Sequence, residues 1–244
     1  MIERQITIRT RDGSMGCFIV HPDRGGPFPV LLFFMDAPGI REELRDMARR
    51  LASTGYYVML PNMYYRTSAD ELGPLTEESR PRIYEHMDSL DIPKVMDDAD
   101  ALLAFADADP AASKGAAGAL GYCMSGQYAI NAAARHPARI RAAASLYGVK
   151  LVTDRPDSPH LVAQKVTGEI YVAAAELDKF VTLDEVGVFS KAVAGAGVNC
   201  EVEIYYAADH GFAFPQRPAY DKACAERHWS RLNDLFARNL HAVA

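Results

Sequence analysis

The chain has 244 residues, of which 49% are hydrophobic and 24% charged, a composition typical of globular proteins. A formal net charge of -6 and the lack of a basic run argue against nucleic acid as a partner, because nucleic-acid binders cluster Lys and Arg. We find neither a secretory signal nor an apolar stretch of membrane-spanning length, and we therefore expect a cytoplasmic protein with no membrane contact.

The first pattern in the chain is a pair of short strands, 5–10 and 15–20, joined at Asp12-Gly13, a dipeptide typical of hairpin turns. Residues 29–35 form an apolar run without alternation, which indicates a strand covered on both faces. Strands and helices then alternate along the chain. The predicted elements are a helix at 41–54, a strand at 56–60, a polar stretch at 62–90 that could cover a site, a helix at 92–108, a strand at 116–121, a helix at 123–135, strands at 142–147 and 169–175, a helix at 183–194, a strand at 201–206 and a helix at 220–240.

Alternation of this kind predicts an α/β fold, with a mostly parallel central sheet, helices on both faces and an antiparallel N-terminal edge. The length exceeds that of many single domains, but α/β folds often reach it with one core. We therefore expect one domain over residues 1–244.

Cys123 lies directly after one apolar strand and directly before a helical pattern. Gly121 and Ser125 stand two positions on either side, and a strained strand-to-helix turn that presents a nucleophile requires small residues there. The following helix would favour a thiolate at its positive end. The backbone N–H of Met124 would face an oxyanion. The pattern predicts a nucleophilic cysteine.

An acid and a base are expected after later strands, in the chain order nucleophile, acid, histidine. Asp178 follows the strand at 169–175, and His210 follows the strand at 201–206. Glu176 and Asp209 compete with Asp178 for the role of the acid. We predict a triad of Cys123, Asp178 and His210, in which His210 acts as the general base.

The three other cysteines, Cys17, Cys200 and Cys224, lie far apart and form no CxxC pair. Their positions suit small apolar residues of a folded interior. We expect no metal site and no zinc or redox motif.

The chain resembles the dienelactone hydrolase family over almost its whole length. The resemblance rests on Gly121-Tyr122-Cys123-Met124-Ser125-Gly126, on Ser145-Leu146-Tyr147-Gly148, on Asp178 and on His210-Gly211-Phe212. It implies the α/β-hydrolase fold, a cysteine triad and no cofactor. It also implies substrate-binding roles for Arg80, Tyr84, Tyr147 and Phe212.

Members of this family carry a glutamate after the third strand that contacts the resting nucleophile. Asp36 stands at that position here, and the resemblance implies that it gates Cys123. The N–H of Ala37 would complete the oxyanion hole with that of Met124. Family members that cleave dienelactone place an arginine four residues beyond the histidine, where this chain has Phe214, and whether Arg217 replaces that arginine stays open.

These features predict a hydrolase of an activated small-molecule ester, lactone or thioester that works through an acyl-Cys123 intermediate. One alternative is a catalytically silent α/β-hydrolase fold that serves as a binding protein. A second is an enzyme like the class I amidotransferases, although these would place a glutamate where Phe212 stands. We expect a monomer or a small homo-oligomer.

Overall fold

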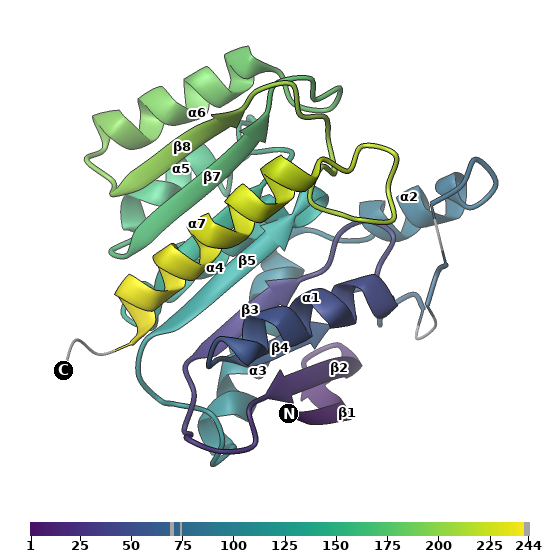
Figure 1. Cartoon of the computed structure of the whole chain (residues 1–244), viewed down its shortest axis with the longest axis vertical. Coiled ribbons are helices and arrows are strands. Elements are labelled where there is room, and N and C mark those ends of the chain that lie inside the picture. The colour runs from purple at the N-terminus through teal and green to yellow at the C-terminus, as the bar shows by residue number, and fades with distance from the viewer. Residues whose placement is uncertain (69–70, 74, 242–244) are drawn as a thin grey trace. The chain divides into compact units, whose positions relative to one another are not determined.

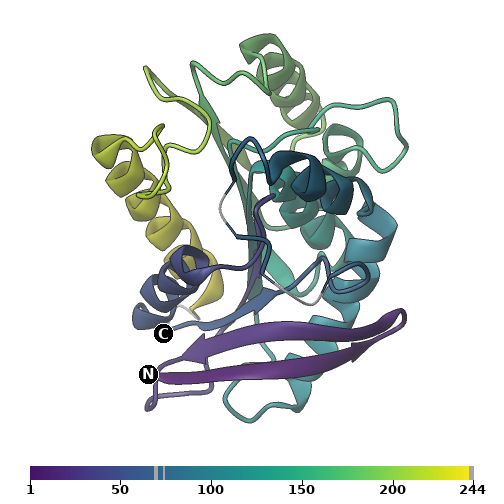
Figure 2. The ribbon, with the colours of Figure 1, turned by 90° about the vertical axis from the view of Figure 1, so that its right-hand side faces the viewer.

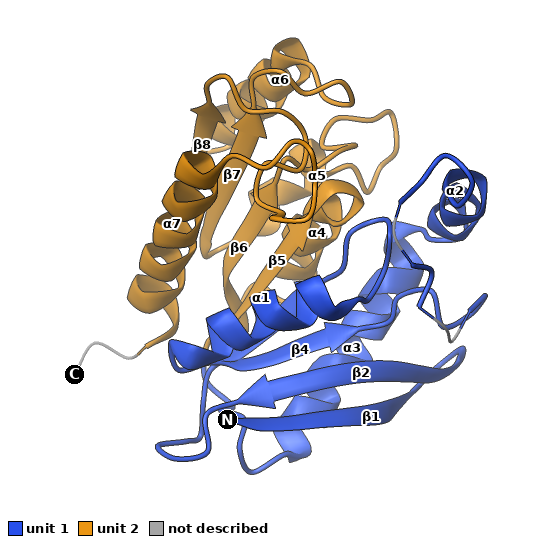
Figure 3. Ribbon diagram, turned by 45° about the vertical axis from the view of Figure 1, so that its right-hand side comes forward, with its two compact units in different colours: residues 1–115 blue, residues 116–244 orange. Residues whose placement is uncertain are grey.

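The computed structural model describes residues 1–68, 71–73 and 75–241. Its contacts divide the chain into two compact units, residues 1–115 and 116–244 (Figure 3). The single domain expected from the length stays a prediction. The polar stretch at 62–90 includes residues 69, 70 and 74, which lie outside the described part.

The first unit contains a mixed sheet of four strands in the order β1-β2-β4-β3 (Figure 1). Its elements are β1 (Ile2–Thr10), β2 (Gly13–His21), β3 (Val30–Phe34), α1 (Glu42–Ser53), β4 (Tyr57–Pro61), α2 (Arg80–Asp88) and α3 (Ile92–Ala108). β1 and β2 form the predicted antiparallel hairpin, and β2 is antiparallel to β4. β3 and β4 pair in parallel, and helix α1 connects them along the chain.

Burial explains the arrangement of this unit. Every residue of β3 is buried, as its uninterrupted apolar sequence predicts for a strand covered on both sides. Helix α1 buries a stripe that includes Leu44, Met47 and Leu51 at helical spacing, and it packs on β2 and β4. Helix α3 packs on β1 and β3 from the opposite face (Figure 2).

The second unit contains four parallel strands in the order β5-β6-β7-β8. Its elements are β5 (Ala117–Tyr122), the 3₁₀ turn η1 (Cys123–Ser125), α4 (Gly126–Arg135), β6 (Ile140–Leu146), α5 (Pro159–Val162), the 3₁₀ turn η2 (Ala163–Lys165), β7 (Glu169–Ala175), α6 (Leu183–Gly195), β8 (Cys200–Tyr205) and α7 (Lys222–Leu240). Because all four strands are parallel, the loops that follow them emerge at one edge of this sheet.

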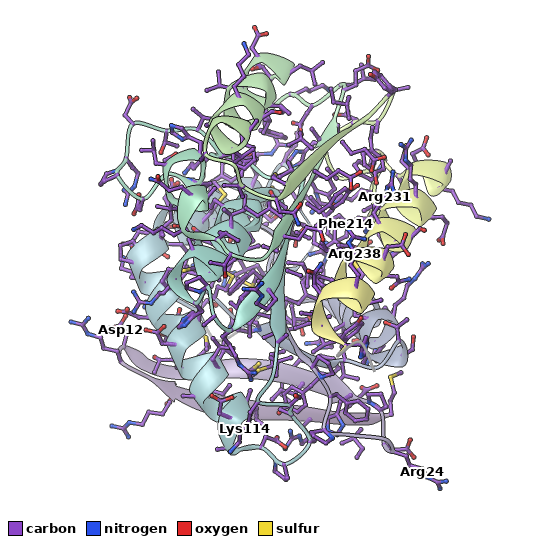
Figure 4. The ribbon with its side chains drawn as sticks, turned by 90° about the vertical axis from the view of Figure 1, so that its left-hand side faces the viewer. Asp12, Arg24, Lys114, Phe214, Arg231 and Arg238 are labelled. Atoms are coloured by element: carbon purple, nitrogen blue, oxygen red, sulfur yellow. The ribbon has the colours of Figure 1, made fainter. Side chains whose placement is uncertain are left out.

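Helix α7 covers one face of the second unit's sheet, and α4 covers the other (Figure 2). Two arginines of α7 that are labelled in Figure 4 tie this helix to the strands beneath it. The Nε atom of Arg238 donates to Glu169 at 2.8 Å, and Arg231 donates to Glu203 at 3.2 Å. Helix α7 is therefore fixed over β7 and β8.

The structure departs from the predicted elements in a few places. The predicted helix at 123–135 starts as a 3₁₀ turn, and its α-helical part begins at Gly126. The predicted strand at 142–147 ends one residue early, because Tyr147 has a left-handed backbone (φ 38°) that leaves the extended conformation. Helices α2 and α5 were not predicted; each is short and has a proline in its first turn.

Candidate active site

Cys123 stands on a strained turn between β5 and α4. Its φ of 55° lies in the left-handed region, which is unfavourable for any residue that has a side chain. A Cβ atom at Gly121 would come within 2.1 Å of the Ser125 carbonyl oxygen, and one at Gly126 within 2.2 Å of Ser145 Oγ. The turn therefore needs glycine at both positions. The small residue at position 121 is predicted from the sequence, whereas the need for glycine at position 126 is not.

His210 and Asp178 meet at the edge where β7 and β8 end. The Nδ1 atom of His210 lies 2.8 Å from Asp178 Oδ2. The other carboxylate oxygen of Asp178 accepts hydrogen bonds from the backbone N–H groups of Phe180 at 2.8 Å and Val181 at 3.3 Å. Since an ionised Asp178 offers only acceptors, the Nδ1 atom of His210 carries a proton. The Nε2 atom is then left to exchange a proton with a reacting group.

The two competing acids make other contacts. Asp209 accepts a hydrogen bond from the backbone N–H of His210, at 2.7 Å, rather than from the imidazole ring. Glu176 accepts one from the backbone N–H of Ala207, also at 2.7 Å. Asp178 is thus the carboxylate that contacts the ring, and the other two hold the backbone of the loop that carries His210.

The surroundings of His210 favour its charged form. Burial by itself would lower the pKa, but the hydrogen bond with Asp178, followed by the interaction with Cys123, outweighs burial and raises the pKa to about 9. The Nε2 atom is buried and has no hydrogen-bond partner among the described residues. An unsatisfied buried nitrogen beside a thiol is a group that a reacting molecule can use.

Two aromatic rings pack against His210. The Tyr147 ring lies 4.9 Å from the imidazole and the Phe180 ring 4.8 Å, both in edge-to-face geometry. Tyr147 and Phe212, which the resemblance makes substrate contacts, are only 1% and 0% exposed. Phe212 stacks on Tyr205 at 4.7 Å. Both residues therefore pack in the interior, and their predicted substrate contacts stay predictions.

A second histidine lies behind the nucleophile turn. His228 of α7 is fully buried, and its Nε2 atom lies 2.9 Å from the hydroxyl of Tyr122, the residue before Cys123. Its Nδ1 atom contacts the carbonyl oxygen of Ala225, so Nδ1 is the donor and the Tyr122 hydroxyl donates to Nε2. Sequence reasoning placed His228 within the last helix and missed this contact, since no local pattern links residues 106 positions apart.

Arg217 lies against the loop that carries His210. A Cβ atom at Gly211 would come within 3.1 Å of the Arg217 side chain, and the guanidinium lies 4.7 Å from the centre of the Phe214 ring, which Figure 4 labels. The guanidinium therefore lies beside the residue that follows His210. A role for Arg217 in substrate binding stays a prediction.

In the first unit, Asp36 belongs to a buried ion-pair cluster. Arg41 donates to both of its carboxylate oxygens, at 2.6 and 3.2 Å, and also to Glu43 at 2.7 Å. The side chains of Asp36 and Glu43 are 0% and 6% exposed. The cluster holds the loop that follows β3. The predicted gating of Cys123 by Asp36 stays a prediction.

The other predicted residues of the first unit lie on two segments. The carbonyl oxygen of Ala37 accepts a hydrogen bond from the Tyr64 hydroxyl at 2.8 Å, which fixes the peptide that follows Ala37. Arg80 begins α2 and is exposed, and Tyr84, on the same helix, is 37% exposed. Their predicted roles in the oxyanion hole and in substrate binding stay predictions.

Two features are absent from the described part of the chain. No group of three or more His, Cys, Asp or Glu side chains there could hold a metal ion. No helix there is both long enough and apolar enough to cross a membrane.

Comparison with known proteins agrees with the fold. The model of the family described as "Dienelactone hydrolase family" matches residues 15–240. A protein of Methylorubrum extorquens named "Putative carboxymethylenebutenolidase" is 30% identical over 240 residues, which cover 97% of this chain and 81% of that protein. The crystal structure of a "Putative Dienelactone Hydrolase" from Klebsiella pneumoniae has a TM-score of 0.88 at 23% identity and covers 97% of this chain and 98% of that one. A dienelactone hydrolase-like promiscuous phosphotriesterase from metagenomic libraries has a TM-score of 0.81 at 20% identity and covers 99% and 100% of the two chains. The predicted α/β-hydrolase fold is confirmed.

Proposed function

Because the chain belongs to the dienelactone hydrolase family, and is thus a hydrolase of ester or lactone bonds, we propose that it cleaves activated esters, lactones or thioesters through an acyl intermediate on Cys123. The observation that carries this proposal is the pairing of His210 with Asp178 at 2.8 Å while Nε2 stays buried and unsatisfied. Cys123 raises the pKa of the same imidazole, which supports its assignment as the nucleophile.

The proposed reaction has two stages. In the first, the sulfur of Cys123 attacks the carbonyl carbon, the bond to the leaving oxygen or sulfur breaks, and His210 Nε2 gives its proton to the leaving group. A pKa of about 9 keeps this proton on His210 at neutral pH. In the second stage a water molecule gives a proton to His210 and attacks the acyl carbon, the bond from that carbon to sulfur breaks, and Cys123 is released as a thiolate beside the protonated imidazole.

Preorganised hydrogen-bond donors would stabilise the oxyanion of both stages. The N–H of Met124, in the 3₁₀ turn η1, is one proposed donor, and the N–H of Ala37 is the other. We retain the proposal that Asp36 gates the resting thiol. Both carboxylate oxygens of Asp36 already accept hydrogen bonds from Arg41.

The chemistry of sulfur supports an activated substrate. A thiolate is a better leaving group than an alkoxide, so the tetrahedral intermediate of an unreactive ester would return to the starting ester. Enol esters, aryl esters, lactones with an enol leaving group and thioesters avoid this return. The cytoplasmic location, the state as a monomer or small homo-oligomer and the lack of a nucleic-acid partner stay predictions.

Mutation of the nucleophile tests the proposal. With 4-nitrophenyl acetate as substrate, we expect Cys123→Ala to lose roughly a thousandfold or more in kcat/KM, because it removes the covalent route. Cys224→Ala is the matched control, since Cys224 is also partly buried and lies in a different element, α7. Mass spectrometry of the wild type should find the acetyl group on Cys123. Undiminished turnover by Cys123→Ala, or acylation of another residue, would contradict the proposal.

A further inference from the structure

Phe180 is an exposed aromatic residue that lies directly on the proposed catalytic base. Its side chain is 61% exposed, yet its ring lies 4.8 Å from the ring of His210. A second ring that packs against the imidazole belongs to Tyr147, which is buried. His210 therefore has one aromatic neighbour that belongs to the packed interior and one that still has most of its surface open to a ligand.

The backbone holds Phe180 in this place. Its N–H donates to Asp178 Oδ1 at 2.8 Å, while Asp178 Oδ2 contacts His210. A single carboxylate thus fixes the position of both the imidazole and the residue that carries the phenyl ring. Because this bond uses the main chain, a change of the Phe180 side chain leaves it in place.

The loops around Phe180 carry further exposed apolar surface. Leu177, three residues before Phe180, is 56% exposed, and Leu183, three residues after it, is 41% exposed. The neighbouring loop after β8 carries Tyr206, which is 70% exposed, and the two loops are joined by a hydrogen bond from Leu177 N–H to the Ala208 carbonyl at 2.9 Å. Large apolar side chains exposed in a group usually mark a binding surface.

The position of the leaving group follows from the proposed reaction, on which this inference rests. The leaving atom must reach His210 Nε2 at hydrogen-bond distance to accept the proton. A group that is attached to this atom then lies beside the imidazole, within reach of the ring that packs on it. We propose that Phe180 is a specificity-determining residue that contacts the leaving group and selects substrates whose leaving group is aromatic or an extended conjugated system.

The test compares two acetate esters whose leaving alcohols have similar acidity, one aromatic and one not: phenyl acetate and hexafluoroisopropyl acetate. We expect Phe180→Ala to lower the ratio of kcat/KM values, phenyl over hexafluoroisopropyl, by about three- to tenfold, the range that one lost aromatic contact produces. Phe180→Tyr retains the ring and should keep the ratio of the wild type. Val188→Ala, a change at a 49% exposed side chain of α6, is the control for loss of exposed apolar surface.

Each outcome decides the proposal. A fall in the ratio with Phe180→Ala that Phe180→Tyr does not show supports it. An equal loss with both esters would mean that Phe180 only positions His210, and an unchanged ratio would mean that it does not meet the leaving group; both results overturn the proposal. The proposed function is tested apart from it, because Cys123→Ala must abolish the turnover of both esters whatever Phe180 does.

Discussion

The raised pKa of His210 predicts a dependence of stability on pH that a single substitution should remove. The pKa rises from 6.5 to about 9 in the folded protein, which corresponds to about 3 kcal/mol. Asp178 is the first of the groups that raise it. We expect Asp178→Asn, which keeps the shape and a neutral acceptor but removes the charge, to lose about 2 kcal/mol of the free energy of unfolding near pH 6.

The sign of the effect follows from the direction of the shift. The folded protein binds the proton more tightly than the unfolded chain, so the stabilisation is fully present below pH 6.5 and is lost as the pH rises through about 9. The difference in free energy of unfolding between wild type and Asp178→Asn should therefore be largest near pH 6. It should shrink to the difference between two neutral hydrogen bonds, about 1 kcal/mol or less, above about pH 10.

Urea unfolding of both proteins at several pH values, under reducing conditions, measures this difference. Asp209→Asn is the matched control, because Asp209 accepts from the backbone N–H of His210 and not from its ring. The effect of Asp209→Asn on the free energy of unfolding should change little over the same pH range. The reasoning would be refuted if the Asp178→Asn difference stayed constant or grew with pH, or if the two variants behaved alike. A titration of the His210 ring by NMR gives the pKa directly.

Three further predictions concern the turn, the ion-pair cluster and the thiol. Gly121→Ala should destabilise the protein by about 3 kcal/mol, because the new Cβ meets a backbone oxygen at 2.1 Å. Gly187→Ala in α6, where nothing lies within 4 Å of the new Cβ, should stabilise the protein by about 0.5 kcal/mol. Thermal unfolding compares the two variants. Arg41→Met should lower the free energy of unfolding by about 3–5 kcal/mol, because it removes the cation that two buried carboxylates share, and a urea titration that shows no loss would contradict this. Iodoacetamide should label Cys123 of the wild type at neutral pH at least about tenfold faster than Cys123 of His210→Gln, as followed by mass spectrometry. Equal labelling rates in the two proteins would argue against a thiolate that the imidazole assists.

Several elements of the fold could be predicted because their signals are local. The bounds of α3 and β7 agree with the predicted ranges 92–108 and 169–175, since an apolar run or stripe on each is closed by polar residues. The hairpin likewise follows from the Asp12-Gly13 dipeptide, although the turn lies one residue earlier than predicted: Arg11 and Asp12 form the loop, and Gly13 is the first residue of β2. Helix α2 could not be predicted in this way, because its sequence, Arg80 to Asp88, is polar and buries only two residues, Ile83 and His86.

The sequence favours Asp178 as the acid, but it does not show what each of the three candidate carboxylates contacts. Glu176, Asp178 and Asp209 all lie near the ends of β7 and β8, and the three differ in what their side chains meet after folding. Two of them bind backbone N–H groups, and Asp178 binds the imidazole of His210. Proximity in sequence did not predict this, since the residue next to His210 bonds to its main chain and the residue 32 positions away bonds to its ring.

The sequence by itself determined the α/β class, the strand-to-helix turn at Cys123 and the presence of His210 on a later loop, because each depends on residues close together in the chain. Only the tertiary structure decided that Asp178 pairs with His210, that Phe180 and Tyr147 pack against the imidazole, and that His228 contacts the turn through Tyr122. These contacts join separate strands and helices. Which residues meet depends on how the parallel strands bring loops that are distant in sequence to one edge of the sheet. No local pattern of residues encodes such long-range contacts.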